Sequence, residues 1–365
     1  MSEVSAIEKR LWSKAEQHVQ SLEGLREPKV EDIFTRRYYI SPQDLLITNY
    51  SRTQPVAAFN PGALERDGKL LVFPRLVFDY YTYNSSIGVF ELDIEKVIQG
   101  RIETPLETEI VLWPEKIWEF GHGCEDPRVM AVNAGTYMLY TGSKHYQLHG
   151  QLIKKSVLGF AELDRSFNVQ RRGYFTTVDG KESVVLSNKD SAFIEIDGNN
   201  ATMLTRPDLQ GEALCWRATA DLNSLTIPEE SMEPVLAPEA WEEKVGWSTN
   251  TVKLSNNEYL VGWHAVLKED LSYKNGLAIV DGSGALLAIS NYLLAPKGLQ
   301  ESYGDRSLVI FGDGLVRYKN RIIWIGGISD YGIGIFIAEL EEALEKLKRI
   351  KQQGGGYPRR NGGLR

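Results

Sequence analysis

The chain of 365 residues contains only two cysteines, Cys124 and Cys215. Two thiols are too few for a disulfide framework or for a structural zinc site built on thiolates. The first residues alternate charged and apolar positions, and they lack the unbroken apolar stretch that a secretory signal or a membrane span requires. We therefore expect a protein of the reducing cytoplasm that does not contact a membrane.

An excess of basic residues is also absent. Lys and Arg together number 41 and Asp and Glu number 49, which gives a formal net charge of −8. Domains that bind nucleic acids usually carry a net basic face, so we expect no nucleic acid partner. A local pocket of cations is still compatible with this total.

Four common catalytic motifs are missing as well, namely GxGxxG after a strand, GxxxxGK[ST], HExxH and GxSxG. His145 and His149 have the i, i+4 spacing of helical zinc ligands, but the Glu that completes HExxH is lacking. We therefore expect no metal, no cofactor and no serine nucleophile.

Helical patterns occur mainly near the two ends of the chain. Residues 5–22 read as an amphipathic helix, and residues 337–351 read as a second helix rich in good helix formers. Between them the chain repeats one pattern: a turn, a short apolar and aromatic strand, and then small or polar residues. The five copies begin at Asp67, Ala134, Asp197, Asn256 and Lys319, so their starts lie 67, 63, 59 and 63 residues apart.

A period of about 60 residues with several strands in each period is typical of a β-propeller. We predict an all-β fold, a five-bladed β-propeller with flanking N- and C-terminal helices. The predicted divisions are an N-terminal helical extension over residues 1–28, a catalytic propeller over residues 29–336, and a C-terminal helix with a flexible tail over residues 337–365.

Each repeated strand is expected to form a β-hairpin with an earlier strand that opens with polar residues. The start of the first strand and the end of the second lie at the same end of a hairpin. Charged residues at strand ends often serve only to blunt sheet edges, but five sets in register favour a site on one axis. The predicted partners are Asn60 with Arg75, Asp126 with Thr141, Asp190 with Arg206, Asn250 with His264, and Asp313 with Asp330.

The most informative of these openings is the segment GHGCEDPRV, which contains Glu125, Asp126 and Arg128. Side chains alternate across a strand, so only one of the two carboxylates is expected to face the axis, and we favour Asp126. Glu125 and Arg128 are expected to form a structural ion pair.

A second set of side chains at the same ends is cationic or aromatic, which favours an anion-binding pocket. Aromatic rings could also stack on sugar rings, although core packing is the commoner role. The cationic set is Arg75, Arg128, Lys189, Arg206 and Lys274 with His264 and Tyr273, and the aromatic candidates are Trp247, Trp263, Tyr80, Tyr81 and Tyr83.

The order of these segments resembles the β-mannoside phosphorylase family, glycoside hydrolase family 130. The segments are FNPGA, CEDPRV, KD with LTRP, GWHA followed by YKNGLA, then GDGLV and GGISD, and they span roughly residues 55–340. The resemblance implies a five-bladed propeller with its active site at one end of the axis. It also implies an inverting enzyme that cleaves β-mannosides with phosphate to give α-mannose 1-phosphate.

By this resemblance Asp126 is the catalytic proton donor, acting through a sugar hydroxyl. Asn60 and Asp330 would hold the mannosyl unit, and we assign Asp190 to the sugar as well. Arg75 would lie between sugar and phosphate. The residues implied to surround the phosphate are Lys189, Arg206, His264 and Tyr273. The expected partners are an oligosaccharide or disaccharide substrate and inorganic phosphate as co-substrate.

The chain also departs from the family pattern. Ser85 and Ser86 stand where many members carry an Arg, and Lys274 stands near the position of another Arg. The segment GWSTN replaces a pattern that contains proline in phosphorylases. An inverting β-mannoside hydrolase of the same fold therefore stays open, as do an arabinan or xylan hydrolase and a noncatalytic carbohydrate-binding propeller. A homo-oligomer is a further expectation, with the terminal helices at the contact between subunits.

Overall fold

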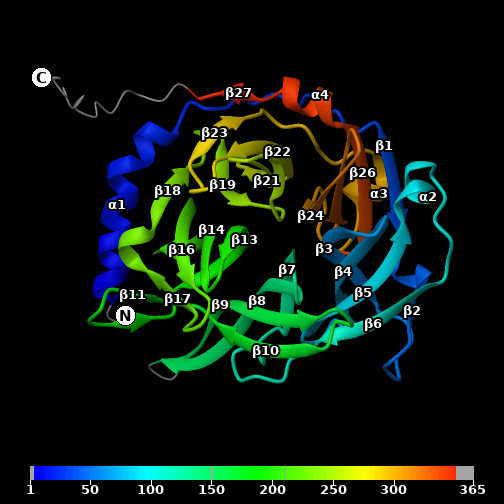
Figure 1. The fold of residues 1–365 in the computed structure, drawn as a ribbon, viewed down its shortest axis with the longest axis horizontal. Coiled ribbons are helices and arrows are strands. Elements are labelled where there is room, and N and C mark those ends of the chain that lie inside the picture. Colours follow the sequence, from blue (N-terminus) through cyan, green and yellow to red (C-terminus); the bar gives the residue numbers. More distant parts are fainter. Residues whose placement is uncertain (1–3, 149–150, 210, 351–365) are drawn as a thin grey trace, which may run out of the picture.

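A computed structural model describes residues 4–148, 151–209 and 211–350 of the protein. Its strands form five hydrogen-bonded sheets arranged around a central axis (Figure 1). The predominance of strands and the propeller-like arrangement confirm the expected all-β class. No helix in the described part of the chain is both long and apolar enough to cross a membrane.

The first two sheets follow one another along the chain. The first has the strand order β2-β6-β5-β4-β3, and the second has the order β10-β9-β8-β7. Their strands are β2 (Leu45–Ile47), β3 (Ala57–Arg66), β4 (Lys69–Val77), β5 (Ser85–Asp93), β6 (Leu106–Leu112), β7 (Cys124–Val132), β8 (Gly135–Leu148), β9 (Gln151–Asp164) and β10 (Val169–Tyr174).

The third sheet is the largest and has the main order β12-β11-β17-β16-β14-β13, with β15 paired to β14 and β18 paired to β16. Its strands are β11 (Thr176–Val178), β12 (Ser183–Val184), β13 (Ser187–Asp197), β14 (Asn200–Leu209), β15 (Glu212–Ala213), β16 (Cys215–Asp221), β17 (Thr226–Pro228) and β18 (Glu233–Leu236).

The fourth sheet has the order β19-β21-β22-β23-β27, with β20 paired to β21, and the fifth has the order β1-β26-β25-β24. Strand β1 comes from the N-terminal part of the chain, so the fifth sheet joins both ends of the ring. The strands are β1 (Arg36–Ile40), β19 (Glu242–Trp247), β20 (Val252–Ser255), β21 (Glu258–Leu267), β22 (Tyr273–Val280), β23 (Leu286–Ile289), β24 (Ile310–Tyr318), β25 (Arg321–Ile328), β26 (Gly332–Glu339) and β27 (Lys348–Arg349).

The expected N-terminal helix is present as α1 (Ala6–Leu22). A capping box between Ser5 and Glu8 satisfies its first backbone donors. Ile7, Leu11 and Ala15 recur at helical spacing, and they are buried in one apolar cluster with residues of the third sheet such as Trp216. This apolar face is therefore covered within the chain, and the expectation that α1 needs a second subunit to cover it is wrong. A homo-oligomer stays a prediction.

The expected C-terminal helix is much shorter than the sequence pattern indicates. Helix α4 covers only Leu340–Glu345, because residues 337–339 belong to β26. Ile337 pairs with Ile323 on one side and with Arg36 on the other, so sheet pairing overrides local helix propensity there. The expected flexible tail beyond residue 350 lies outside the described residues, and the three divisions of the chain stay predictions.

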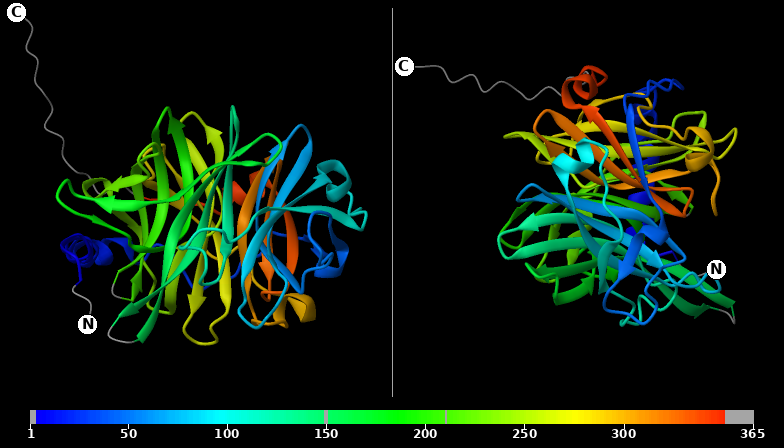
Figure 2. Two further views of the ribbon diagram at one scale, coloured as in Figure 1. Left: turned by 90° about the horizontal axis from the view of Figure 1, so that it is seen from below. Right: turned by 90° about the vertical axis from the view of Figure 1, so that its right-hand side faces the viewer.

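The remaining helical segments are short and lie between strands. They are α2 (Ile94–Ile98), α3 (Gly298–Ser302), and the 3₁₀ turns η1 (Pro42–Asp44) and η2 (Glu229–Ser231). Viewed from the sides, the strands run between two faces of the disc, and α1 lies outside the ring (Figure 2). His145 lies in β8 rather than on a helix, and His149 lies outside the described residues, so the structure does not place them as a helical pair.

Candidate functional site

A cavity of about 520 Å³ lies where polar strand ends of all five sheets meet near the axis. The nine side chains to which the sequence assigned a catalytic or binding role all line this cavity, whereas Arg128 and Lys274 of the predicted cationic set do not. The nine are Asn60, Arg75, Asp126, Lys189, Asp190, Arg206, His264, Tyr273 and Asp330.

Three of these side chains reach the cavity through the same backbone irregularity. Asn60, Asp126 and Asp190 have positive φ angles of 44°, 51° and 51°, and each lies at a β-bulge in the first strand of its hairpin. Asn and Asp tolerate this left-handed conformation better than most residues, and a bulge redirects the side chain that it carries. An Asn or Asp at these three bulges therefore suits both the left-handed backbone conformation and the polar cavity.

The bulges also shift the predicted register by one residue. Arg75, Thr141 and Arg206 pair with Phe59, Glu125 and Lys189, rather than with the bulged residue that follows each of these. The predicted pairs were wrong in register because an extra residue in one strand is invisible to a count along the sequence.

The other two predicted pairs are wrong for different reasons. His264 pairs with Gly246, whereas Asn250 lies beyond β19 and its side chain bonds the backbone of Leu315. Asp313 lies in a bulge between Phe311 and Gly314, so it has no strand partner, and Asp330 follows the end of β25.

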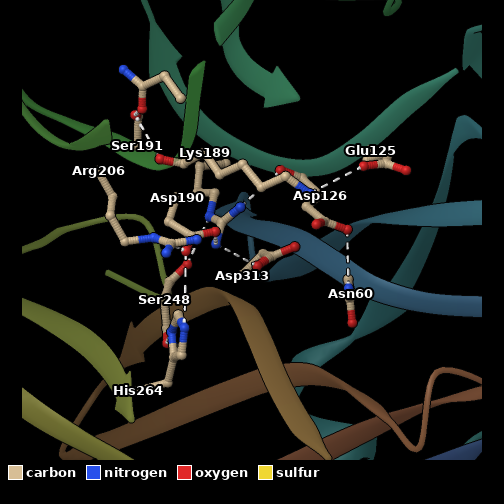
Figure 3. Close-up of polar contacts among 12 residues, drawn as sticks. Asn60, Glu125, Asp126, Lys189, Asp190, Ser191, Arg206, Ser248, His264 and Asp313 are labelled. Atoms are coloured by element: carbon tan, nitrogen blue, oxygen red, sulfur yellow. Dashed lines mark hydrogen bonds and ion pairs between the residues drawn. The ribbon is translucent and has the colours of Figure 1, made fainter. Parts of the chain in front are cut away.

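Asp126 is held from two sides. Asn60 Nδ2 donates to its Oδ1 at 3.0 Å (Figure 3), and Arg75 Nη1 donates to the same oxygen at 3.1 Å. The second oxygen, Oδ2, has no hydrogen-bond partner among the described residues. One carboxylate oxygen is therefore fixed and the other is available to a ligand.

Glu125 also faces the cavity, contrary to the prediction from simple alternation. Its Oε1 accepts from Arg75 Nη2 at 2.9 Å, and its Oε2 lies 3.6 Å from Lys189 Nζ. The bulge at Asp126 interrupts alternation, so neighbouring carboxylates reach the same arginine. The predicted ion pair between Glu125 and Arg128 is therefore wrong.

Arg128 instead lies beneath the cavity, where it is 3% exposed. Its Nη2 is 2.8 Å from Asp313 Oδ1 and 3.3 Å from Asp190 Oδ1, and its Nε donates to the Ser248 carbonyl at 2.7 Å. The pKa of the fully buried Asp313 is raised well above its usual range by burial, although Arg128 opposes that shift. Arg128 therefore supports the site from below and does not line it.

The cationic side of the cavity is built around Asp190. Burial acts to raise the pKa of Asp190, but the charges of Arg206 and Arg128 outweigh it and hold that pKa well below the usual range. Arg206 Nε lies 2.6 Å from Asp190 Oδ2, and Lys189 is the adjacent residue. The ion pair fixes the Arg206 guanidinium at the cavity wall (Figure 3).

His264 and Tyr273 form the neighbouring wall, with ring centroids 5.5 Å apart and planes inclined by 16°. Burial lowers the pKa of His264 to about 3, so the ring is neutral at physiological pH and pairs through Nδ1 with the Ser248 hydroxyl at 3.0 Å. Gly246 is required opposite this ring, because a Cβ there would approach His264 Cε1 to 2.4 Å.

Sequence reasoning missed Lys244 and chose Lys274 instead. Lys244 lines the cavity and its Nζ lies 5.3 Å from the centroid of the Tyr273 ring, whereas Lys274 does not line the cavity. Within residues 4–148, 151–209 and 211–350, Lys244 forms no ion pair. The signal was available two residues before Gly246 in the strand that pairs with GWHA.

Three further lining residues, Asp305, Arg306 and Val309, come from the segment between α3 and β24. Arg306 Nε lies 3.7 Å from Asp330 Oδ2, and Tyr83 donates through its hydroxyl to Asp305 at 3.2 Å. Burial raises the pKa of Asp330 to about 6, although Arg75 acts in the opposite direction. Tyr83, which the sequence suggested only as an aromatic platform for sugars, lines this cavity as well. The lining residues to which the sequence gave no place in the site are His122, Glu125, Lys244, Asp305, Arg306, Val309 and Phe311.

Comparison with known proteins identifies a family. The model of glycoside hydrolase family 130, described as beta-1,4-mannooligosaccharide phosphorylase, matches residues 25–349. This match confirms the resemblance found in the sequence. None of the curated proteins searched matches the chain in sequence.

Several solved structures share the fold. A β-1,2-mannobiose phosphorylase from Listeria innocua, in complex with β-1,2-mannobiose, has a TM-score of 0.60 and 17% identity, over 86% of this chain and 99% of its own. A mannose phosphorylase from Leishmania mexicana, in complex with phosphate ion, has a TM-score of 0.55 and 14% identity, over 95% and 98%.

A third structure was reported with the finding that this family of mannoside phosphorylases contains hydrolases targeting β-1,2-mannosidic linkages in Candida mannan. It has a TM-score of 0.60 and 17% identity, over 87% of this chain and 92% of its own. At such identities the likeness to solved structures shows the fold.

Proposed function

Because the chain belongs to glycoside hydrolase family 130, the family of beta-1,4-mannooligosaccharide phosphorylases, we propose that it is an inverting glycoside phosphorylase. It cleaves β-mannosides with inorganic phosphate and releases α-mannose 1-phosphate. The observation that carries this proposal is one cavity in which Asp126, with a free carboxylate oxygen, faces a wall of anion-binding side chains.

In the proposed reaction a phosphate oxygen bonds to the anomeric carbon from the face opposite the leaving sugar. The glycosidic C–O bond breaks, and the departing oxygen receives the proton of Asp126 through a hydroxyl of the mannosyl unit. Asn60 and Arg75 fix Asp126 Oδ1, so that Oδ2 meets this hydroxyl. Asn60, Asp190 and Asp330 are the proposed partners of the sugar.

Phosphate is already an anionic nucleophile, so it needs positioning by cations rather than activation by a second carboxylate. Lys189, Arg206 and Lys244 supply positive charge, and neutral His264 and the Tyr273 hydroxyl supply further polar contacts. Lys189 and Arg206 are each close to a carboxylate, whereas the charge of Lys244 has no ionic partner among the described residues. Lys244 therefore contributes the most strongly to net attraction for an anion.

The substitution Lys244→Met tests the phosphate site. Loss of one charge-assisted contact is expected to raise the KM for phosphate roughly ten- to hundredfold, while the KM for the sugar changes little. Steady-state kinetics at varied phosphate concentration measures both values. Lys274→Met, a lysine outside the cavity, is the matched control and should behave as the unmodified enzyme.

Equal effects of Lys244→Met on phosphate and on sugar would remove Lys244 from the phosphate site. Turnover that does not respond to phosphate at all would favour the hydrolase of the same fold, and sugar binding without turnover would favour a carbohydrate-binding propeller.

We also propose that the five sheets are the five blades of the propeller, because each sheet contributes a side chain to the one cavity.

A further inference from the structure

A second cavity, of about 570 Å³, lies on the first sheet beside the proposed catalytic cavity. It is bounded by the turn after β2, by the segment joining β4 to β5, and by the end of β6. Tyr83 from the β4–β5 segment lines the catalytic cavity, whereas Tyr81 and Asn84 from the same segment line the second cavity. The two cavities are therefore neighbours across one short segment.

The second cavity is walled by exposed aromatic rings. Tyr81 is 95% exposed, Trp113 is 48% exposed and Tyr50 is 47% exposed. Tyr50 contacts Phe78, another lining residue, edge to face with ring centroids 5.1 Å apart.

The sequence suggested five aromatic platforms for sugars. Trp247 and Trp263 are fully buried in the core, Tyr83 lines the catalytic cavity, and Tyr80 lines neither cavity. Tyr81 is the one of the five that lines the second cavity.

The polar side chains around these rings carry little net charge. Arg52 Nη1 lies 3.9 Å from Asp79 Oδ2, and the other polar members include Asn49 and Asn84. Ser86 is 6% exposed, and its hydroxyl has no hydrogen-bond partner among the described residues. A buried hydroxyl without a partner is costly, and a ligand hydroxyl would satisfy it.

This chemistry contrasts with the catalytic cavity, where most walls are charged. Flat aromatic faces with neutral hydrogen-bonding groups complement a neutral ligand that has apolar C–H faces and many hydroxyls. Among soluble ligands, a carbohydrate has these properties and a phosphate ester does not.

We infer that the second cavity is a carbohydrate-binding site that holds further sugars of an oligosaccharide whose end residue occupies the catalytic cavity. This inference rests on the proposed function for the identity of the sugar. The link between the cavities is Ser85, which lines the second cavity and accepts a hydrogen bond from Arg75 Nε at 2.8 Å. An occupant of the second cavity that contacts Ser85 is therefore connected to Arg75 of the catalytic cavity through one hydrogen bond.

Trp113 allows a test that does not depend on turnover, because it is the one exposed tryptophan among the eight in the chain. The probes are β-linked mannobiose and mannotetraose, added to the Asp126→Asn variant with mass spectrometry to confirm that they stay intact. Mannotetraose is expected to protect Trp113 from acrylamide quenching, and mannobiose is not.

Affinities of both sugars are then measured by calorimetry with substitutions in the same background. Trp113→Ala is expected to weaken binding of mannotetraose about fivefold to tenfold and to leave mannobiose unchanged. Trp113→Phe, which keeps a ring, should recover most of the affinity. Tyr303→Ala is the matched control, since Tyr303 is 75% exposed but lines neither cavity.

Equal weakening for both sugars, or no weakening by Trp113→Ala, would overturn the inference. A change in the mass of the protein in solution on Trp113→Ala would also overturn it, because it would assign the aromatic face to a contact between subunits. Phosphate-dependent turnover by the unmodified enzyme with Trp113 unprotected would refute this site alone. Protection of Trp113 without any turnover of mannosides would refute the proposed reaction alone.

Discussion

Asp330 is the carboxylate of the site whose ionisation is most open to measurement. Burial raises its pKa from 3.8 to about 6, so its contribution to stability is fully present below the unfolded pKa and is lost as the pH rises through about 6. At neutral pH the folded enzyme therefore carries the cost of a buried negative charge. Burial is the main cause of this cost, and the nearby charge of Asp126 adds to it.

Asp330→Asn removes that cost. Relative to the unmodified enzyme, the variant is expected to gain up to about 3 kcal/mol in free energy of unfolding between pH 4 and pH 7.5, since one pKa unit corresponds to about 1.4 kcal/mol. Urea denaturation of both proteins across this range measures the difference. A difference that stays constant with pH would contradict the raised pKa.

At the residue scale, chemistry was predictable and backbone detail was not. The types and order of the polar residues brought the nine side chains with an assigned role to one cavity, but Arg128 and Lys274 of the predicted cationic set do not line it. The bulges at Asn60, Asp126 and Asp190 were missed, and with them the inward position of Glu125. Lys244 was missed because a single lysine in a strand looks like a surface charge until its partner strand is known.

Among the elements, α1 shows a local pattern that was sufficient. Its capping box and apolar spacing fix both its start and its buried face. The opposite case is α4, where the same kind of residues was taken into β26 because a strand on either side was available for pairing. Local helix propensity therefore predicted α1 correctly, because α1 packs against a sheet. It failed at residues 337–339, because these residues could pair with strands on both sides.

The substitution Leu11→Ala tests how much α1 contributes to the fold. Leu11 is 1% exposed within the apolar cluster on the third sheet, so truncation is expected to cost about 2–5 kcal/mol of unfolding free energy. Chemical denaturation measures the loss. The exposed Lys9→Ala change on the same helix should stay within about 0.5 kcal/mol. Equal stability of the two variants would show that α1 is only loosely attached.

At the scale of the whole molecule, two arginines connect all five sheets around the axis. Arg75 from the first sheet contacts Glu125 and Asp126 of the second. Arg128 from the second sheet reaches Asp190 of the third, the Ser248 carbonyl beside the fourth, and Asp313 of the fifth. The period of about 60 residues predicted the repeated sheets, but not these connections, which depend on side chains from distant hairpins.

Arg128→Met is expected to destabilise the fold by about 3–5 kcal/mol, because it leaves the buried Asp313 without its cation and leaves Asp190 paired with Arg206 alone among the described residues. Adding Asp313→Asn should recover part of the loss, since it removes the buried carboxylate that has lost its cation. Melting temperatures of the single and double variants measure both effects. The exposed Arg165→Met change is the control and should have little effect. No recovery in the double variant would contradict the electrostatic explanation.

Phosphorolysis is tested by product analysis with β-linked mannobiose in the presence and absence of inorganic phosphate. We expect mannose 1-phosphate of α configuration, formed only when phosphate is present and in equal amount to the released sugar. Free mannose formed at the same rate with and without phosphate would contradict phosphorolysis, and would show that water is the nucleophile in this cavity.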